Sequence, residues 1–263
     1  MRILVLVKEV PDMNLVKFDS EKGTVNRKGA PAELNPFDES ALECALMLKE
    51  ENENVTVTTL SMGMLRAMDT LRDTYARGAD DTVLLSSKEL GGSDTFATSK
   101  ALAEAAKKVG FDLIIAGEKS VDGDTAQVGA EVAQLLDIPH AYYVDKADLN
   151  ENLIVCEIEN LSGSRQIREM KLPALIGVTK NIGKLRLPTV NRRLESLDKE
   201  FRILSLGDLP DLRPEDVGFH GSPTKVAEIN VPKAPERESR IYADDLTGFT
   251  SFCVKQLKER GVL

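Results

Sequence analysis

The first half of the chain alternates between short apolar runs and stretches with helical periodicity. The run Ile3–Val7 is continuously apolar and is followed by polar and turn residues, which is typical of a buried strand in a parallel sheet. Later strands are expected at Val55–Leu60, Thr82–Leu85, Leu113–Ala116 and His140–Val144. Because strands separated by helical stretches of this length need right-handed β-α-β connections, the pattern predicts a doubly wound, mostly parallel α/β sheet.

Four helices are expected between these strands. Asn35-Pro36 predicts the first helix start, because Asn can cap free N–H groups and Pro fits the first helical position. The next two helices are expected to end at Gly78 and Gly110. The fourth is expected from about Asp124 to Leu136. Ligands of such sheets bind outside the carboxyl ends of the strands, so the segments directly after strands are the candidate sites.

The pattern changes at about Ala147. Leu153–Glu159 and Gln166–Leu172 are predicted to form an antiparallel hairpin, and Pro173–Val178 a further strand. From Asn181 the chain is basic, with scattered prolines and little periodicity, until a final helix at residues 244–260 with one apolar face. A poorly self-packing stretch of this length is either disordered or lies on a partner. We therefore expect an α/β domain at residues 1–183 and an extended C-terminal arm at residues 184–263.

Composition argues against several protein classes. Aromatic residues make up 5% of the chain and Trp is absent, which disfavours stacking on single-stranded nucleic acid. The net charge of −9 disfavours binding to nucleic-acid backbones or anionic membranes. The three cysteines form no CxxC motif, so neither a zinc site nor an iron–sulfur cluster is expected. With no signal peptide and no apolar run of ~18 residues, the expectation is a soluble cytoplasmic protein without membrane insertion.

The segment Gly117–Ala130, between a predicted strand and a predicted helix, is the most informative part of the sequence. A phosphate-binding turn needs small residues, converging backbone N–H groups and a helix N-terminus behind them. Gly123 and Gly129 supply the small residues, Thr125 a hydroxyl donor and Gln127 an amide donor. The segment is therefore a candidate phosphate-binding turn, although it matches neither the P-loop nor the GxGxxG pattern.

The same residues also fit a capped turn that holds no ligand. In that interpretation Asp124 caps the helix and Gly123 supplies a positive φ angle. Asp122 and Asp124 are unfavourable neighbours for a phosphate. The residues alone leave the two interpretations open.

Three motifs stand in order along the chain: Val7-Lys8-x-Val10-Pro11-Asp12, Asn35-Pro36-Phe37-Asp38-Glu39-x-Ala41-Leu42-Glu43 and Asp122-Gly123-Asp124-Thr125-Ala126-Gln127-Val128-Gly129. Together they resemble the β subunit of electron-transfer flavoproteins over essentially the whole chain. The resemblance implies an adenine-nucleotide hydrolase-like α/β fold and a C-terminal arm that embraces an α subunit. The stretch around Thr189-Val190-Asn191 resembles the family's docking loop for a partner dehydrogenase, whereas Arg192 and Arg193 are expected on a solvated face.

Members of this family hold either structural AMP or a second FAD in the β-subunit pocket. The run at residues 123–129 resembles the second, electron-bifurcating type, in which the FAD takes a hydride from NADH. One electron then goes to the α-subunit FAD and a flavin dehydrogenase of acyl-CoA or 2-hydroxy-acid type, the other to ferredoxin or flavodoxin. Ala130 and Glu118-Lys119 depart from the residues expected there. The alternatives are an AMP-holding subunit and a nucleotide-binding regulatory or stress-type protein of the same fold.

The resemblance also implies which residues bind the cofactor, whereas no side chain is expected to act as an acid, base, nucleophile or metal ligand. Simpler roles are open for some of them: Leu6 and Met62 can pack in the core, and Lys8 can pair with Glu9 or Asp12. The implied cofactor-binding residues are Leu6, Lys8, Asn35, Phe37, Asp38, Ser61, Met62, Gly63, Gly117, Val121, Asp122, Gly123, Asp124, Thr125, Ala126, Gln127, Val128, Gly129 and Ala130.

Overall fold

The computed structural model describes residues 1–13, 15, 17–19, 24–26, 31–159, 162–227, 241–243 and 245–263, with residues 17–19 and 24–26 as backbone only. The chain divides into two compact units, Met1–Glu228 and Ile229–Leu263. Each is described by itself.

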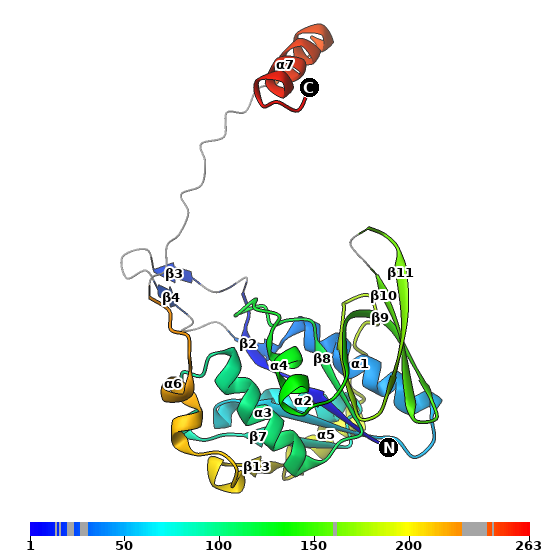
Figure 1. Cartoon of the computed structure of the whole chain (residues 1–263), viewed down its shortest axis with the longest axis vertical. Helices are drawn as coiled ribbons and strands as arrows, with labels where there is room; N and C mark the ends of the chain where they lie inside the picture. Colours follow the sequence, from blue (N-terminus) through cyan, green and yellow to red (C-terminus); the bar gives the residue numbers. More distant parts are fainter. Residues whose placement is uncertain are drawn as a thin grey trace. The chain divides into compact units, whose positions relative to one another are not determined.

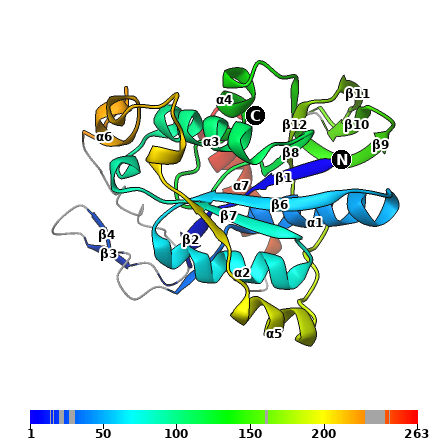
Figure 2. The same cartoon turned by 90° about the horizontal axis from the view of Figure 1, so that it is seen from below.

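The larger unit is built on a nine-stranded sheet with the order β11-β10-β9-β12-β8-β1-β6-β7-β13 (Figure 2). Neighbouring strands from β9 to β13 are parallel, whereas β10 and β11 run antiparallel at one edge. The predicted doubly wound α/β sheet with an antiparallel hairpin is confirmed. The strand bounds are β1 Arg2–Leu6, β6 Thr56–Met62, β7 Asp81–Leu85, β8 Leu113–Gly117, β9 His140–Asn150, β10 Leu153–Glu159, β11 Arg165–Lys171, β12 Ala174–Val178 and β13 Arg202–Leu204.

Helices cover both faces of this sheet (Figure 2). Alternate residues of β1 point to opposite faces, so Ile3 and Val5 belong to one buried cluster and Leu4 to the other. The helices α1 (Pro36–Glu51) and α2 (Met68–Arg77) complete the first cluster. The helices α3 (Thr95–Val109) and α4 (Val128–Leu135) complete the second. Because helices cover both faces of the sheet, the carboxyl ends of its central strands remain as the place for a ligand.

The helix ends confirm some expectations and correct others. Helices α2 and α3 end at Gly78 and Gly110, both with positive φ angles, as the sequence predicts. Helix α4 begins at Val128, four residues later than expected, because Asp124 and Ala126 have left-handed backbone with φ of 54°. Asp124 therefore does not cap this helix, and Gly123 is not among the glycines with positive φ.

The loop expected between the first strand and α1 contains short strands. The strands β2 (Glu9–Pro11) and β5 (Ala32–Leu34) pair antiparallel with each other. The strands β3 (Lys17–Asp19) and β4 (Thr24–Asn26) form a second antiparallel pair (Figure 1). Each of these strands has only three residues, which is too short for a recognisable alternation of apolar and polar side chains.

Residues 184–227 are ordered and join the larger unit, which corrects the expectation of a poorly packed stretch. They form α5 (Val190–Asp198), the edge strand β13, the short helices η3 (Leu206–Asp208) and η4 (Pro214–Asp216), and α6 (Gly218–Gly221). Because β13 pairs with β7 in the main sheet, the boundary expected after residue 183 lies later, after residue 228.

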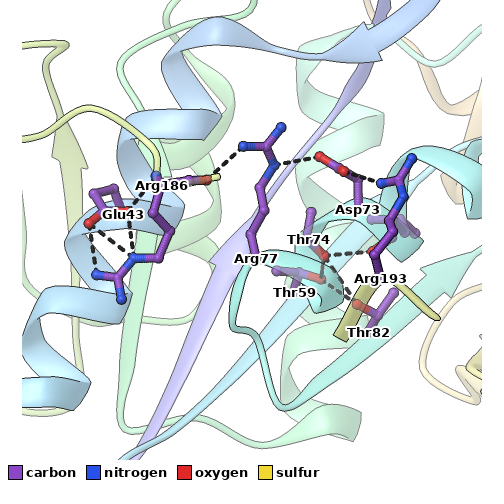
Figure 3. A network of polar contacts seen from close by, with 9 residues as sticks. Glu43, Thr59, Asp73, Thr74, Arg77, Thr82, Arg186 and Arg193 are labelled. Atoms are coloured by element: carbon purple, nitrogen blue, oxygen red, sulfur yellow. Dashed lines mark hydrogen bonds and ion pairs between the residues drawn. The ribbon is translucent and has the colours of Figure 1, made fainter. Parts of the chain in front are cut away.

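Arginine side chains fasten this stretch to the core (Figure 3). Arg186 forms an ion pair of 2.8 Å with Glu43 of α1, and its carbonyl accepts a 2.7 Å hydrogen bond from Arg77 of α2. Asp73 of α2 bonds both Arg77 and Arg193. Nearby, the buried hydroxyls of three threonines bond one another at 2.8 to 3.2 Å, joining α2 to the sheet: Thr59, Thr74 and Thr82. The basic stretch is therefore bonded to α1 and α2, although Arg193 itself is 55% exposed.

The smaller unit contains helix α7 (Leu246–Glu259), which confirms the predicted final helix. Asp245 caps it by accepting a 2.8 Å hydrogen bond from the Gly248 amide. Tyr242 contacts the rings of Phe249 and Phe252, with centroids 5.8 Å apart in each pair. In the described parts of both units, no helix is long and apolar enough to span a membrane.

Candidate nucleotide-binding site

A cavity of about 450 Å³ lies at the carboxyl ends of the central parallel strands. Its walls come from segments that directly follow β1, β7 and β8, together with the N-terminal turns of α1, α3 and α4. This is the position that the strand-end rule predicts. The predicted site residues that line it are Leu6, Lys8, Asp38, Met62, Gly117, Gly123, Thr125, Ala126, Gln127, Val128 and Gly129.

The other predicted residues lie beside this cavity without lining it. Phe37 is buried, and the ammonium groups of Lys180 and Lys119 lie 4.4 and 5.6 Å from its ring centroid. Ser61 is buried, and its hydroxyl has no hydrogen-bond partner within the described residues. Gly63 lines a neighbouring hollow. The remaining residues of this group support the walls from behind: Asn35, Val121, Asp122, Asp124 and Ala130.

Two ion pairs fasten the turn that follows β8. The ammonium of Lys8 lies 2.7 and 2.9 Å from the two carboxylate oxygens of Asp122, so Lys8 does not make the expected pair with Glu9 or Asp12. The ammonium of Lys119 lies 2.7 Å from the carboxylate of Asp124. Each aspartate is therefore neutralised by a lysine of the same site. This pairing removes the electrostatic objection to a phosphate that the bare sequence raises.

Backbone N–H groups between this turn and helix α4 are available to a ligand. Within the described parts of the chain, the amides of Thr125–Val128 donate to no protein acceptor. Gln127 is the N-terminal cap residue of α4, and its side chain makes no capping hydrogen bond. Unpaired amides at a helix N-terminus attract anions, because the helix dipole adds to their partial positive charge. The segment therefore offers an anion-binding surface at the cavity wall.

Asn35 ties helix α1 to the cavity turn. Its Nδ2 donates to the Lys119 carbonyl at 2.9 Å, and its Oδ1 accepts from the Val121 amide at 3.1 Å. The side chain makes no cap hydrogen bond to α1, which corrects the expected capping role. Since Asn35 is fully buried, both of its bonds are shielded from water.

Asp38 joins the ends of two neighbouring strands. Its Oδ2 accepts a 2.8 Å hydrogen bond from the Lys8 amide after β1, and the Gly117 amide at the end of β8 also bonds the carboxylate. Burial raises the pKa of Asp38 to about 7, although hydrogen bonds from Asn35, Lys8 and Gly117 oppose this rise. A Cβ atom at residue 117 would lie 2.5 Å from Asp38 Oδ1, so glycine is required there.

Tyr142 of β9 lines the cavity and was not predicted from the sequence. Added Cβ atoms would lie 1.9 Å from its hydroxyl oxygen at Gly129 and 2.5 Å from its ring at Gly177. Gly129 therefore makes room for Tyr142. Burial raises the pKa of Tyr142 above its usual value. The residue follows His140 at the start of a strand, where sequence periodicity alone does not distinguish a wall residue from a core residue.

One whole wall of the cavity was also missed. It is formed by the loop after β7 and the first turns of α3, and it comprises Leu90, Gly92, Ser93, Asp94, Thr95, Thr98 and Leu102. This loop contains the short helix η2 (Lys88–Leu90). Its position directly after a parallel strand is the signal that identifies it, because the strand-end rule applies to every strand of the sheet.

Two shallower hollows adjoin the cavity. One, of about 620 Å³, shares Met62 and Leu90 with it and extends over Gly63, Leu65 and Arg66. The other, of about 510 Å³, shares Asp94, Thr95, Thr125 and Gln127 with it and extends to Glu131, Pro223 and Thr224. The cavity and the two hollows share lining residues in this way, and the three spaces together are called the trough.

The family follows from comparison with known proteins. The model of the electron transfer flavoprotein domain matches residues 22–198, which is more than half of the chain. The chain belongs to the electron transfer flavoprotein family. It is 42% identical over 250 residues to electron transfer flavoprotein subunit beta of Megasphaera elsdenii, covering 92% of this chain and 90% of that protein.

Two further relatives match along their whole length. The subunit beta of Thermoanaerobacterium thermosaccharolyticum is 37% identical over 264 residues, covering 100% of both chains. The caffeyl-CoA reductase-Etf complex subunit CarD of Acetobacterium woodii has the same identity and coverage. The predicted resemblance to electron-transfer flavoprotein β subunits is confirmed.

Proposed function

We propose that this electron-transfer flavoprotein chain is the FAD-binding subunit of an electron-bifurcating complex that oxidises NADH. One electron passes to the FAD of an α subunit and its partner dehydrogenase, and the other to a low-potential acceptor such as ferredoxin or flavodoxin. CarD, one of the relatives, is named as a subunit of a reductase–Etf complex. The proposal extends that kind of role to this chain.

The observation that carries the FAD proposal is that two further hollows share lining residues with the cavity. A mononucleotide would fit inside the 450 Å³ cavity alone, whereas the cavity and the two hollows together offer more room. A dinucleotide has two ring systems joined by a pyrophosphate, so it needs a larger site of this kind. The unpaired amides of Thr125–Val128 belong to residues that line the cavity, and they suit the pyrophosphate.

Side-chain size in the turn agrees with this ligand. A Cβ atom on Gly123 would contact only Ser120 Oγ at 3.5 Å, so the space beside Gly123 is open. Thr125 and Ala126 are also small and line the cavity. The ion pairs Lys8–Asp122 and Lys119–Asp124 compensate the charges of these two aspartates.

Bound FAD would supply the redox chemistry, since a flavin exchanges two electrons with NADH and single electrons with other carriers. The chain itself binds and orients the cofactor. Asn35 and Asp38 hold the turn after β8 against the end of β1, and Leu6, Met62 and Leu90 exclude water from the cavity wall. No acid, base or nucleophile on the chain is needed for this role.

Two exposed apolar surfaces support the proposed partners. On α5, Val190, Leu194 and Leu197 recur at helical spacing and are 59 to 75% exposed. On α7, Leu246 and Phe249 are exposed. We assign α7 and its unit to the α subunit and the α5 surface to the dehydrogenase. A self-contained regulatory protein of the same fold would need neither surface.

The test is to identify and count the nucleotides released when the purified complex with its α subunit is denatured. Two FAD molecules per heterodimer, together with direct and fast reduction by NADH, are the expected result. One FAD and one AMP, with slow reduction by NADH, would instead establish the AMP-holding alternative. Absence of any nucleotide on this subunit would contradict both.

A further inference from the structure

The segment Val217–Thr224 is bonded to the cavity wall formed by residues 91–95, although the two lie 125 to 130 positions apart in the chain. The Gly218 amide donates to Ser93 Oγ at 3.0 Å. The hydroxyl of Ser222 accepts from the Asp94 amide at 2.8 Å and donates to the Gly218 carbonyl at 2.6 Å. Beyond this segment, only residues 225–227 of the larger unit are described.

Asp94 stands at the centre of this contact. Its Oδ1 accepts from the Ala97 amide at 3.0 Å and so caps helix α3, whereas its Oδ2 accepts from both the amide and the hydroxyl of Thr224, at 2.9 and 2.8 Å. Asp94 also lines the main cavity. One carboxylate therefore joins the cavity wall, the start of α3 and the C-terminal segment.

Close backbone contacts define the position of the segment against this wall. Gly218 has a φ angle of +62°, and a Cβ atom there would lie 1.9 Å from the Glu89 carbonyl oxygen. Gly92 has a φ angle of +77°, and its Cβ position is 3.3 Å from Phe219 Cβ. Val217 is fully buried in the core cluster that also contains Leu90. Such close backbone approach fixes the position of the segment relative to the wall.

The segment also forms part of the trough itself. Pro223 and Thr224 line the hollow of about 510 Å³ together with Thr125 and Gln127, and these last two residues line the main cavity as well. Displacement of the segment would therefore remove one side of the trough and release Asp94 at the same time.

We propose that Ser222 and Thr224 are positioning residues for the ligand, acting through Asp94 on the wall Gly92–Thr95. They couple the affinity for an adenine nucleotide, AMP or FAD, to the binding of the segment Val217–Thr224 against this wall. The proposal rests on the proposed nucleotide-binding function of the cavity. Because coupling between two sites is reciprocal, bound nucleotide must also stabilise the contact between this segment and the wall.

The first experiment measures the dissociation constants of AMP and of FAD for the full chain by titration calorimetry. Ser222→Ala leaves the Asp94 amide without its acceptor and is expected to weaken binding about tenfold. Thr224→Val removes one hydrogen bond and is expected to weaken binding about threefold, whereas Thr224→Ser keeps the hydroxyl and retains wild-type affinity. Thr250→Val, which removes a comparable helix hydroxyl from α7, is the matched control.

The second experiment measures hydrogen exchange of residues 217–227 with and without AMP or FAD. The proposal requires that nucleotide slows exchange there in the wild-type chain and slows it less in Thr224→Val. Wild-type affinity in both Ser222→Ala and Thr224→Val, or exchange in this segment that is indifferent to nucleotide, would overturn the coupling. If the wild-type chain binds neither nucleotide, the proposed function fails, and that result is distinct from either of these.

Discussion

The backbone amide of Lys8 donates a hydrogen bond of 2.8 Å to Oδ2 of Asp38. Through this bond, a carboxyl group in the first turn of α1 holds the chain where it leaves β1. Asn35, three residues earlier, holds the turn after β8 in the same way. The first turn of α1 thus fixes the relative positions of two strand ends that border the cavity.

The titration of Asp38 gives the first prediction. Burial raises its pKa from 3.8 to about 7, so its neutral form is favoured in the folded state. The resulting contribution to stability is fully present below pH 3.8 and is lost as the pH rises through about 7. Asp38→Asn should remove this loss, on the order of 3 kcal/mol between pH 4 and pH 8. Urea denaturation of the nucleotide-free chain across this range measures the difference, with Asp69→Asn on the exposed side of α2 as the control. An unchanged pH slope in Asp38→Asn would contradict the assignment.

Asn35→Ala should destabilise the chain by about 2 kcal/mol, because it leaves a part-buried carbonyl and a part-buried amide without their partner. Hydrogen exchange at the Val121 amide should accelerate, whereas the first turn of α1 should be unaffected. Asn52→Ala, which removes one local part-buried bond to the Leu48 carbonyl at the other end of α1, is the control. Faster exchange confined to the first turn of α1 would instead show that the Asn35 side chain caps this helix.

Gly129 and Tyr142 should be strongly coupled. Gly129→Ala places a Cβ atom 1.9 Å from the Tyr142 hydroxyl oxygen, and the next ring atom is 3.1 Å away. The single substitution should therefore cost about 2 kcal/mol or more through overpacking. Tyr142→Phe removes the clashing oxygen and should recover most of that loss in the double variant. Chemical denaturation of the four proteins in this cycle measures the coupling, and additive effects would show that the two residues are independent.

The trough can be shortened without strain in the backbone. Gly123→Asp enters open space, and Ala126→Asn occupies a residue with φ of 54°, a conformation that Asn tolerates well. The double variant adds bulk and charge beside the amides of residues 125–128, so it should lose FAD while still binding AMP. Gly123→Ala, which adds only a methyl group, should keep both. Nucleotide release from the complex is the measurement, and retained FAD in the double variant would contradict the proposed path of the pyrophosphate.

Arg192 should matter more for stability than its neighbour Arg193. The guanidinium of Arg192 donates to the carbonyls of Tyr75 and Ala79 and lies over the Tyr75 ring, 4.5 Å from its centroid. Arg193 pairs with Asp73 from a side chain that is 55% exposed. Arg192→Met should therefore cost about 2 kcal/mol, and Arg193→Met less than about 1 kcal/mol. Equal losses of melting temperature in the two variants would contradict this ranking.

Local sequence determined most of the strands and helices of residues 35–183, strand β1 and the general place of the site. The apolar run at β1, the glycines that end α2 and α3, and the motif at residues 122–129 depend on near neighbours, and each was interpretable from the chain alone. The strand-end rule then located the cavity, because it depends only on the order of strands and helices.

The tertiary structure alone decided how side chains are used within that site. The Asn35 side chain bonds the turn after β8 and does not cap its own helix, Lys8 pairs with Asp122, and Gly129 accommodates Tyr142. In each case the observed partner is distant in sequence, so no local sequence pattern identifies it. For Asn35 and Lys8, a nearer partner in the sequence was equally plausible. Residues 184–227 have weak periodicity, so their packing could not be predicted locally either. Arginine side chains hold this stretch through bonds between it and α1 and α2. These contacts exist only once the sheet and its helices have assembled.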